Sequence, residues 1–162
     1  MSEGAPEAPW LGEDTIDLAA LILASHHRAW GMPLVAGTGA NRSHRQAAQE
    51  LFSAATVVLA HDGSEDPRLI YANRAALTLW RRRWSEMVGM PSRLTAEPVE
   101  RQARSAVLAR ALRSEAIAGY AGIRIDSSGR RFWIQGARLW TLRDGSGHAC
   151  GQAAAFDSWW WL

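Results

Sequence analysis

The sequence predicts an α+β fold in which helices lie on one face of a five-stranded antiparallel sheet and further helices precede it. Two short runs, at 56–59 and 69–72, are rich in β-branched and other apolar residues and end at turn residues, which is typical of strands. Apolar residues recur at helical spacing between 97 and 118, and two glycine-containing turns separate the last three strands. Segregated helices and antiparallel strands define this fold class.

The N-terminal part of the chain is expected to lie outside the sheet domain. Residues 1–12 combine glycine, prolines and acidic residues, so we expect a flexible leader that Trp10 anchors at its end. Residues 13–41 predict a helix followed by a glycine-rich loop. Gly31 and Pro33 are the expected helix stop.

The main domain is predicted to occupy residues 42–162. It begins with a second helix at 42–54 and continues into the strands at 56–59 and 69–72. Asn73 follows the second strand, where its side-chain oxygen can cap the next helix. A structural cap is the favoured role for this residue and a ligand contact is the alternative.

The second half predicts the longest helix and a three-stranded meander. Residues 97–118 place an apolar stripe opposite a row of arginines. The strands are expected at 120–125, 131–142 and 148–159. Together the inner face of the sheet and the crossing helices enclose the natural place for a pocket.

Composition limits the classes of protein that fit. The chain has 162 residues, all 18 basic residues are arginine, and the formal net charge is only +2, so no nucleic-acid partner is expected. Cys150 is the only cysteine, which excludes an intramolecular disulfide and favours a reducing compartment. No signal peptide or membrane-spanning run is recognisable, and we expect a cytoplasmic location and no membrane span.

Several blocks of the chain resemble a known family. The segment DPRLIYANRAAL at 66–77 resembles the strand-to-helix step of PAS domains. The later blocks resemble the MEKHLA domain family, in the right order, at 91–97 with Arg101, 120–124, 127–132, 139–144 and 151–154 with Phe156 and Trp159. The likeness covers roughly residues 13–162.

The resemblance implies a PAS-like domain of the stand-alone bacterial type. MEKHLA domains also occur at the C-terminus of plant homeodomain-leucine-zipper transcription factors, and they are thought to sense or regulate without a settled ligand. The expected function is therefore a sensory or protein-interaction module in signal transduction, not an enzyme, which signals through a protein partner or a homodimer.

A small ligand, if bound, is expected inside the domain. The residues expected to line its pocket are Tyr71, Trp80, Arg101, Tyr120, Arg124, Trp133 and Gln152. Core packing is the alternative role for Tyr71 and for the tryptophans, since large aromatic rings supply core area in a domain with only three phenylalanines.

Three adjacent tryptophans precede the last residue, Leu162. Neighbouring strand residues face opposite sides, so at least one of Trp159, Trp160 and Trp161 should point outward unless something covers it. We expect an interaction surface there, either for a second copy of the chain or for the N-terminal helix.

Flavin and haem are both unlikely cofactors, and the ligand stays unknown. Flavin-binding light-oxygen-voltage domains carry a cysteine in an Asn-Cys-Arg motif, whereas Cys150 lies on the last strand without that motif. Gln152 occupies the strand on which those domains carry a glutamine that faces the flavin. Haem-binding PAS domains generally use a histidine on the long helix, and 97–118 contains none. No histidine pair has metal-ligand spacing with a third donor.

Two alternative functions remain open from the residues alone. A small enzyme of the hydratase or isomerase type could use His61 or Asp126 as a base, although His61 is more typical of a solvated turn. A structural subunit of a larger assembly would bury arginine and tryptophan surfaces against its neighbours.

Overall fold

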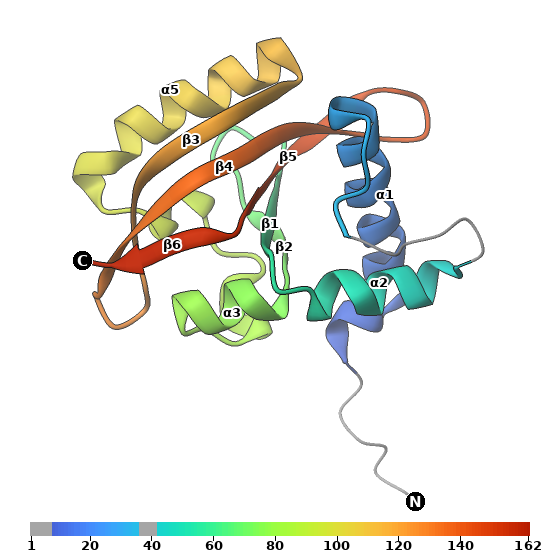
Figure 1. Ribbon diagram of the computed structural model, residues 1–162, viewed down its shortest axis with the longest axis horizontal. Coiled ribbons are helices and arrows are strands. Elements are labelled where there is room, and N and C mark those ends of the chain that lie inside the picture. The colour runs from blue at the N-terminus through green and yellow to red at the C-terminus, as the bar shows by residue number, and fades with distance from the viewer. Residues whose placement is uncertain (1–7, 36–41) are drawn as a thin grey trace, which may run out of the picture.

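A six-stranded antiparallel sheet forms the centre of the protein, with five strands in the order β2-β1-β5-β4-β3 and β6 paired with β4 (Figure 1). The computed structural model describes residues 8–35 and 42–162, except for the side chains at 98–99 and 111–113. The strands are β1 (Val57–Asp62), β2 (Leu69–Ala72), β3 (Ala116–Ile125), β4 (Arg131–Arg143), β5 (Ala149–Phe156) and β6 (Ser158–Trp161). The predicted α+β class and five-stranded antiparallel sheet are confirmed.

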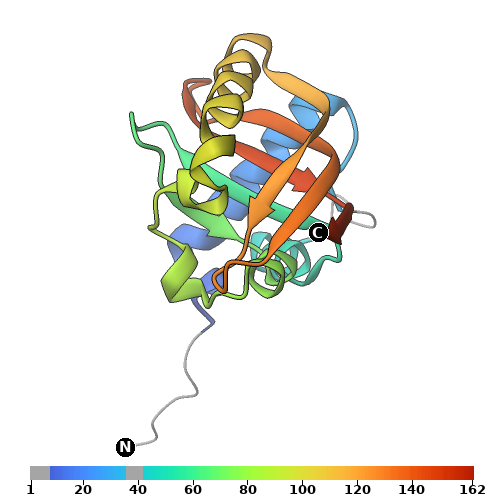
Figure 2. The same ribbon diagram turned by 90° about the vertical axis from the view of Figure 1, so that its left-hand side faces the viewer.

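Helices cover both faces of this sheet. They are η1 (Pro9–Leu11), α1 (Glu13–Trp30), α2 (His44–Ser53), α3 (Arg74–Trp80), α4 (Trp84–Met87), η2 (Ser92–Thr95) and α5 (Pro98–Ser114). Figure 2 shows α5 in front of the sheet and α1 behind it. The buried side chains of α3 pack in the core on the α5 side of the sheet, whereas Trp84 at the start of α4 packs with the N-terminal helices on the other side.

The face under α1 is a filled core. Ile22 of α1 and Leu51 of α2 pack against Val58, Tyr71 and Trp140 of the sheet, and all five are fully buried. The N-terminal helix therefore packs on its own sheet. Burial of this much apolar surface is the main source of stability on this side.

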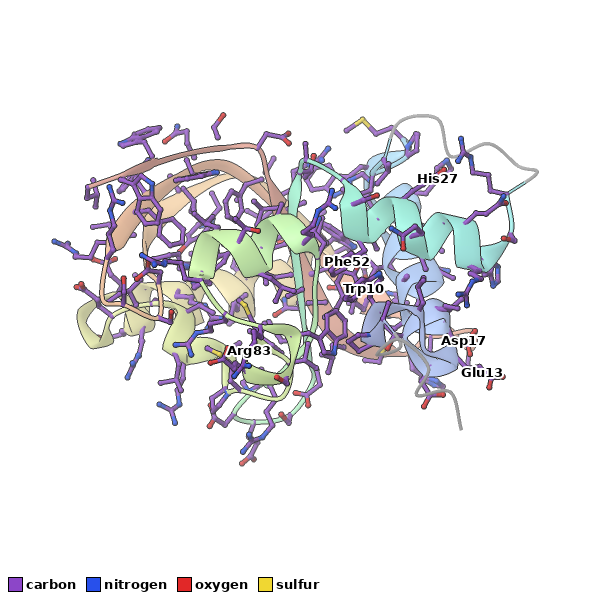
Figure 3. The ribbon with its side chains drawn as sticks, turned by 90° about the horizontal axis from the view of Figure 1, so that it is seen from below. Trp10, Glu13, Asp17, His27, Phe52 and Arg83 are labelled. Atoms are coloured by element: carbon purple, nitrogen blue, oxygen red, sulfur yellow. The ribbon has the colours of Figure 1, made fainter. Side chains whose placement is uncertain are left out.

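The segment before α1 is anchored through an aromatic stack. The ring of Trp10 lies parallel to that of Phe52 on α2, with centroids 3.7 Å apart, and its indole nitrogen donates to Gln49 (Figure 3). Trp10 thus anchors its segment as expected. The rest of the expected leader, residues 1–7, and the glycine-rich loop at 36–41 lie outside the described residues.

Asn73 joins three elements through one buried side chain. Its Oδ1 accepts from the backbone amides of Ala76 in α3 and Val58 in β1. Its Nδ2 donates to the carbonyls of Leu51 and Thr56. The expected helix cap is present, and the other three bonds fix the end of α2 against β1. All the hydrogen-bonding capacity of this amide goes to the backbone, which leaves none for a ligand.

The long helix is shorter than its pattern predicts. It ends at Ser114, and Glu115 turns the chain with a left-handed φ of 67°. Ala116 then pairs with Trp140 in the sheet. Residues 116–118, predicted as helix, are therefore strand, because tertiary pairing outweighs the modest helix propensity of alanine and isoleucine.

Two glycines bend the β3–β4 ribbon. Gly119 on β3 and Gly136 on β4 have positive φ values of 72° and 64°, and each lies where the pairing register shifts. Left-handed glycines at such shifts form β-bulges, which increase local twist and bend the strand. The bent ribbon curves around α5 (Figure 2).

The predicted last strand is two strands. β5 ends at Phe156 beside β1, the chain bends at Asp157, and β6 continues along Phe132 to Gln135 of β4. Asp157 Oδ1 accepts a 2.6 Å bond from the Thr56 hydroxyl, which holds the bend.

Candidate ligand cavity

A small cavity lies between α5 and the sheet. Its apolar wall comes mainly from Leu59, Leu69, Val107, Ile134, Leu139 and Phe156. Trp80 of α3 lies among the other lining residues. The space open to the centres of water-sized molecules is about 50 Å³. One such molecule needs about 10–15 Å³, so the cavity has room for roughly four water-sized groups.

Polar side chains from three strands and α5 project into this apolar space. They are His61 of β1, Arg104 of α5, Tyr120 and Arg124 of β3, and Gln152 of β5. No aspartate or glutamate is among the described residues that line the cavity. The cavity therefore holds cationic groups without a carboxylate.

Arg124 and Tyr120 form one unit on β3. Arg124 is 6% exposed; it donates to the Tyr120 hydroxyl and to the Ile123 carbonyl, each at 2.8 Å. Gly122 lies between them, and a Cβ there would come within 2.9 Å of the Tyr120 hydroxyl and 3.3 Å of the Arg124 guanidinium. The missing side chain at Gly122 thus makes room for the pair. The Tyr120 hydroxyl accepts this bond, so its own proton remains available.

Arg104 reaches the same space from α5. Its guanidinium donates to the Ser92 hydroxyl at 2.9 Å. Burial, and then the nearby positive charge of Arg124, lower the pKa of Arg104 to about 10. The side chain is still protonated at neutral pH, so two guanidinium ions repel each other beside an apolar wall.

His61 is buried and only half satisfied. It is 8% exposed, and its Nδ1 lies 2.8 Å from the carbonyl oxygen of Asp62. Burial, followed by the charge of Arg104, lowers the pKa of His61, so the ring is neutral at pH 7. A neutral ring that donates from Nδ1 to the carbonyl leaves Nε2 as an acceptor. Nε2 is buried without a partner among the described residues.

Gln152 closes the outer end of the cavity. Its Nε2 donates to the carbonyl of Leu108 on α5 at 2.9 Å. Outside this contact lies an open groove that shares His61, Arg104, Leu108 and Gln152 with the cavity. The side-chain bond between β5 and α5 therefore lies at the boundary between the cavity and the open groove.

The structure brings four of the seven expected pocket residues together. Trp80, Tyr120, Arg124 and Gln152 line the cavity. Arg101 lies in the open groove, where its Nε donates to the carbonyls of Arg93 and Ala96.

Tyr71 and Trp133 lie elsewhere, and the expectation for them is wrong. The register of β2 shifts between Leu69 and Tyr71, so Tyr71 faces the α1 core with Trp84 instead of sharing the face of Leu69. Trp133 points to the outside of β4, where its indole nitrogen donates to Gln135. A bulge in the first case and strand alternation in the second decide the direction.

His61, named only as the base of an alternative enzyme, and Arg104 line the cavity although neither was among the seven residues expected there. His61 was expected in a solvated turn, but β1 extends to Asp62, and His61 pairs with Gln152 of β5. Arg104 belongs to the arginine row of the long helix, which was expected opposite the apolar stripe, and the carboxylate of Glu97 does not pair with it. Glu97 instead pairs with Arg131 at 2.9 Å. Only the three-residue spacing from Arg104 to the apolar Val107 hinted at an inward position.

The three C-terminal tryptophans divide between core and surface. Trp159 and Trp161 pack edge-on against Phe132, and Trp161 also lies under the Arg130 guanidinium at 4.0 Å. Trp160 is 51% exposed and lies 6.4 Å from Trp133, ring centre to ring centre. The N-terminal helix is on another part of the sheet and does not cover it (Figure 1).

An antiparallel sheet in this order, with a long helix crossing its concave face over an inner cavity, defines a PAS-like domain. The chain belongs to the MEKHLA family, whose domain model matches residues 16–161. None of the curated proteins searched matches the chain.

Solved structures share the fold at low sequence identity. The PAS domain of a protein from Colwellia psychrerythraea has a TM-score of 0.61 at 14% identity, covering 70% of this chain and 95% of that one. An RNA-binding light-oxygen-voltage receptor has a TM-score of 0.61 at 21% identity, covering 78% and 35%. A light-oxygen-voltage domain studied with a flavin analogue has a TM-score of 0.56 at 22% identity, covering 75% and 86%. At these identities the likeness concerns the fold alone.

The cavity does not fit a flavin. Pockets that enclose molecules of that size measure about 300–1,000 Å³, far more than the space under α5. Cys150 is exposed on β5 and does not line the cavity, so its thiol is not placed against a ring bound there. The cavity is too small for a haem for the same reason.

The described part of the chain contains neither a candidate metal site nor a candidate membrane-spanning helix. No group of three or more metal-ligating side chains occurs in it, and none of its helices is long and apolar enough to cross a membrane.

The pair of groups needed for acid–base chemistry is also not assembled among the described residues. His61 Nε2 has no polar partner. Asp126 Oδ1 accepts bonds from Ser128 and Arg130 within its own turn.

Proposed function

We propose that this MEKHLA domain is a sensory module that binds a small ligand in the cavity under α5 and does not catalyse a reaction. The observation that carries the proposal is the cavity itself, a mainly apolar space lined by His61, whose buried Nε2 lacks a partner. Unsatisfied buried polar groups are costly, and a ligand with matching groups would offset that cost.

Helix α5 is the element proposed to report ligand binding. The α5 side chains described, at 100–110 and 114, are all at least partly exposed, so none of these residues fixes the helix by complete burial. A ligand that contacts α5 and the sheet together would favour one position of the helix over another, which is how a ligand shifts a conformational population.

We also propose that the signal passes to a second copy of the chain through β6. Among the described strands β6 pairs only with β4, so its other edge is free, and Trp160 is exposed beside it. A free edge strand pairs readily with its own copy in an antiparallel, two-fold arrangement. Exposed apolar area beside that edge would strengthen such pairing.

Native mass spectrometry of protein purified from cells that naturally express it tests both parts. The expected result is a homodimer with one small molecule per chain. The variant Ala154→Leu places a larger side chain in the cavity wall and should lose the small molecule. Ala106→Leu, on the exposed side of α5, is the matched control and should retain it.

Trp160→Arg tests the interface independently of the cavity. It should convert the dimer to a monomer and leave the small molecule bound. A ligand-free monomer as the wild-type species would contradict the whole proposal. A small molecule retained by Ala154→Leu would place the ligand elsewhere.

A further inference from the structure

The charges of the cavity identify the class of ligand, in an inference that rests on the proposed function. Arg124 is 6% exposed, and it donates hydrogen bonds to a hydroxyl and a carbonyl, both neutral. Arg104 bonds to the neutral Ser92 hydroxyl. Neither arginine forms an ion pair with any carboxylate of the described residues. A buried cation without a counter-ion costs several kcal/mol, so the protein gains when an anion occupies the space between the two.

The arrangement of donors matches a carboxylate. Each guanidinium has five N–H groups in a planar fork, and Arg124 uses two of them in its bonds to Tyr120 and Ile123. The Tyr120 proton is also free. Donors from β3 and α5 thus converge from two sides, which suits the two oxygens of a carboxylate.

The rest of the cavity restricts the anion further. Its wall is mainly aliphatic and aromatic, through Leu59, Ile134, Leu139 and Phe156, so one end of the ligand is apolar. The space holds roughly four water-sized groups. Inorganic phosphate is polar on all sides and would leave oxygens against that wall, which disfavours it.

His61 supplies a third point of recognition. Its buried Nε2 is an acceptor without a partner, and the ring lines both the cavity and the groove. An ionised carboxylate cannot donate a hydrogen bond to His61 Nε2, whereas a hydroxyl group next to the carboxylate can.

We propose that the cavity binds a short-chain organic acid, with its carboxylate between Arg104 and Arg124, its apolar end against the aliphatic wall and a hydroxyl donating to His61. Helix α5 carries Arg104 and β3 carries Arg124, so the bound carboxylate links the helix to the sheet. The negative charge of the bound ligand then holds α5 in place against the sheet.

Titration of the full chain with propionate, lactate, propionamide and inorganic phosphate, at constant ionic strength and followed by amide NMR shifts, tests the ligand class. Propionate should bind at least tenfold more tightly than its neutral isostere propionamide and than phosphate. Lactate should bind about threefold more tightly than propionate, as expected for one added hydrogen bond. Equal binding of propionate and propionamide overturns the proposal, and so does stronger binding of phosphate.

Variants locate the binding groups. Arg104→Met and Arg124→Met should each weaken propionate binding at least tenfold, whereas Arg110→Gln, on the exposed side of α5, should leave it unchanged. Without ligand both Met variants should melt at or above the wild-type temperature, because an uncompensated buried charge is removed. A purely structural role predicts a lower melting temperature and unchanged binding. His61→Leu should remove the advantage of lactate over propionate.

The outcome separates this inference from the proposed function. If native mass spectrometry finds a neutral molecule that Ala154→Leu excludes, the acid assignment is wrong and the sensory cavity stands. If no compound binds the wild-type chain and Ala154→Leu behaves as the wild type, both proposals are wrong.

Discussion

Helices α1 and α5 each cross one face of the same sheet, and they are attached in different ways. Helix α1 buries Ala19, Ile22, Ser25 and His26 completely or almost completely against the sheet and α2. The described side chains of α5 are all at least partly exposed, and under this helix lies the cavity. Among the described residues, α1 therefore contributes fully buried side chains to the core and α5 contributes none.

The polar contacts of α5 are few and come mostly from arginines. Arg104 bonds to Ser92, Arg101 bonds to two carbonyls before the helix, and Glu97 at the helix start pairs with the half-exposed Arg131. Exposed ion pairs contribute little, about 0–1 kcal/mol each. Both faces of the sheet carry a buried apolar core, and the difference lies in the helices: α1 contributes fully buried side chains, whereas none of the described α5 side chains is fully buried. Under the proposed function, α5 is therefore the helix expected to move.

The largest expected effect comes from truncating one apolar residue on each helix. Ile22→Ala removes a fully buried side chain from the α1 core and should lower the free energy of unfolding by about 3 kcal/mol. Leu108→Ala on α5 enlarges a space that already exists beside solvent, and should cost less than about 1.5 kcal/mol. Urea unfolding measures both values.

Equal losses for the two variants would show that α5 is as firmly packed as α1. That result would remove the basis for treating α5 as the moving element. The slope of the urea transition should stay the same in both variants, because each removes the same kind of side chain without changing the unfolded chain.

The second effect is a loss of stability in acid. His26 of α1 is buried against Trp140. Burial, followed by the charges of Arg138 and His27, lowers its pKa to about 4, and a bond to the Met32 carbonyl acts in the opposite direction. The unfolded chain takes up this proton near pH 6.5, whereas the folded chain does so only near pH 4. Stability therefore falls as the pH decreases between these values, by up to about 3 kcal/mol.

The variant His26→Gln separates this contribution from that of His61. The pKa of His61 is also lowered, so the cavity face contributes acid sensitivity of the same sign. The slope of the unfolding free energy against pH gives the number of protons taken up on unfolding. Between pH 6 and 4.5 this number should be smaller by nearly one in His26→Gln, whatever the absolute stability of the variant. An unchanged slope would mean that His26 does not become charged on unfolding.

The contrast between the two faces also explains what the sequence could predict. Strand and helix identities, the Asn73 cap and the inward position of Arg124 follow from local patterns and from period-two alternation. Tyr71 does not follow this alternation because one extra residue of β2 lies between the pairs made by Leu69 and Tyr71 with β1. The residue types at 69–72 give no sign of this bulge. The pairing of Ala116 with Trp140 likewise depends on a strand 24 residues away.

His61 and Arg104 were left out of the expected ligand pocket for a related reason. A polar residue at a strand end or on an arginine-rich helix is normally solvated, and only the packing of α5 across β1 buries these two. Residues that break local rules in this way are concentrated at functional sites. Both residues lie in the cavity, and the carboxylate proposal depends on both.

The smallest expected effect concerns the bond that closes the cavity. Gln152→Leu removes the donor to the Leu108 carbonyl, a single net hydrogen bond worth about 0.5–1.5 kcal/mol. Because this bond fixes only α5, amides of α5 should exchange with deuterium about 2–10-fold faster, while those of α1 should not change. Gln135→Leu, on the exposed face of β4, is the matched control and should alter neither helix. Faster exchange in both helices would mean that the two faces open together, and the expectation that α5 moves on its own would then be wrong.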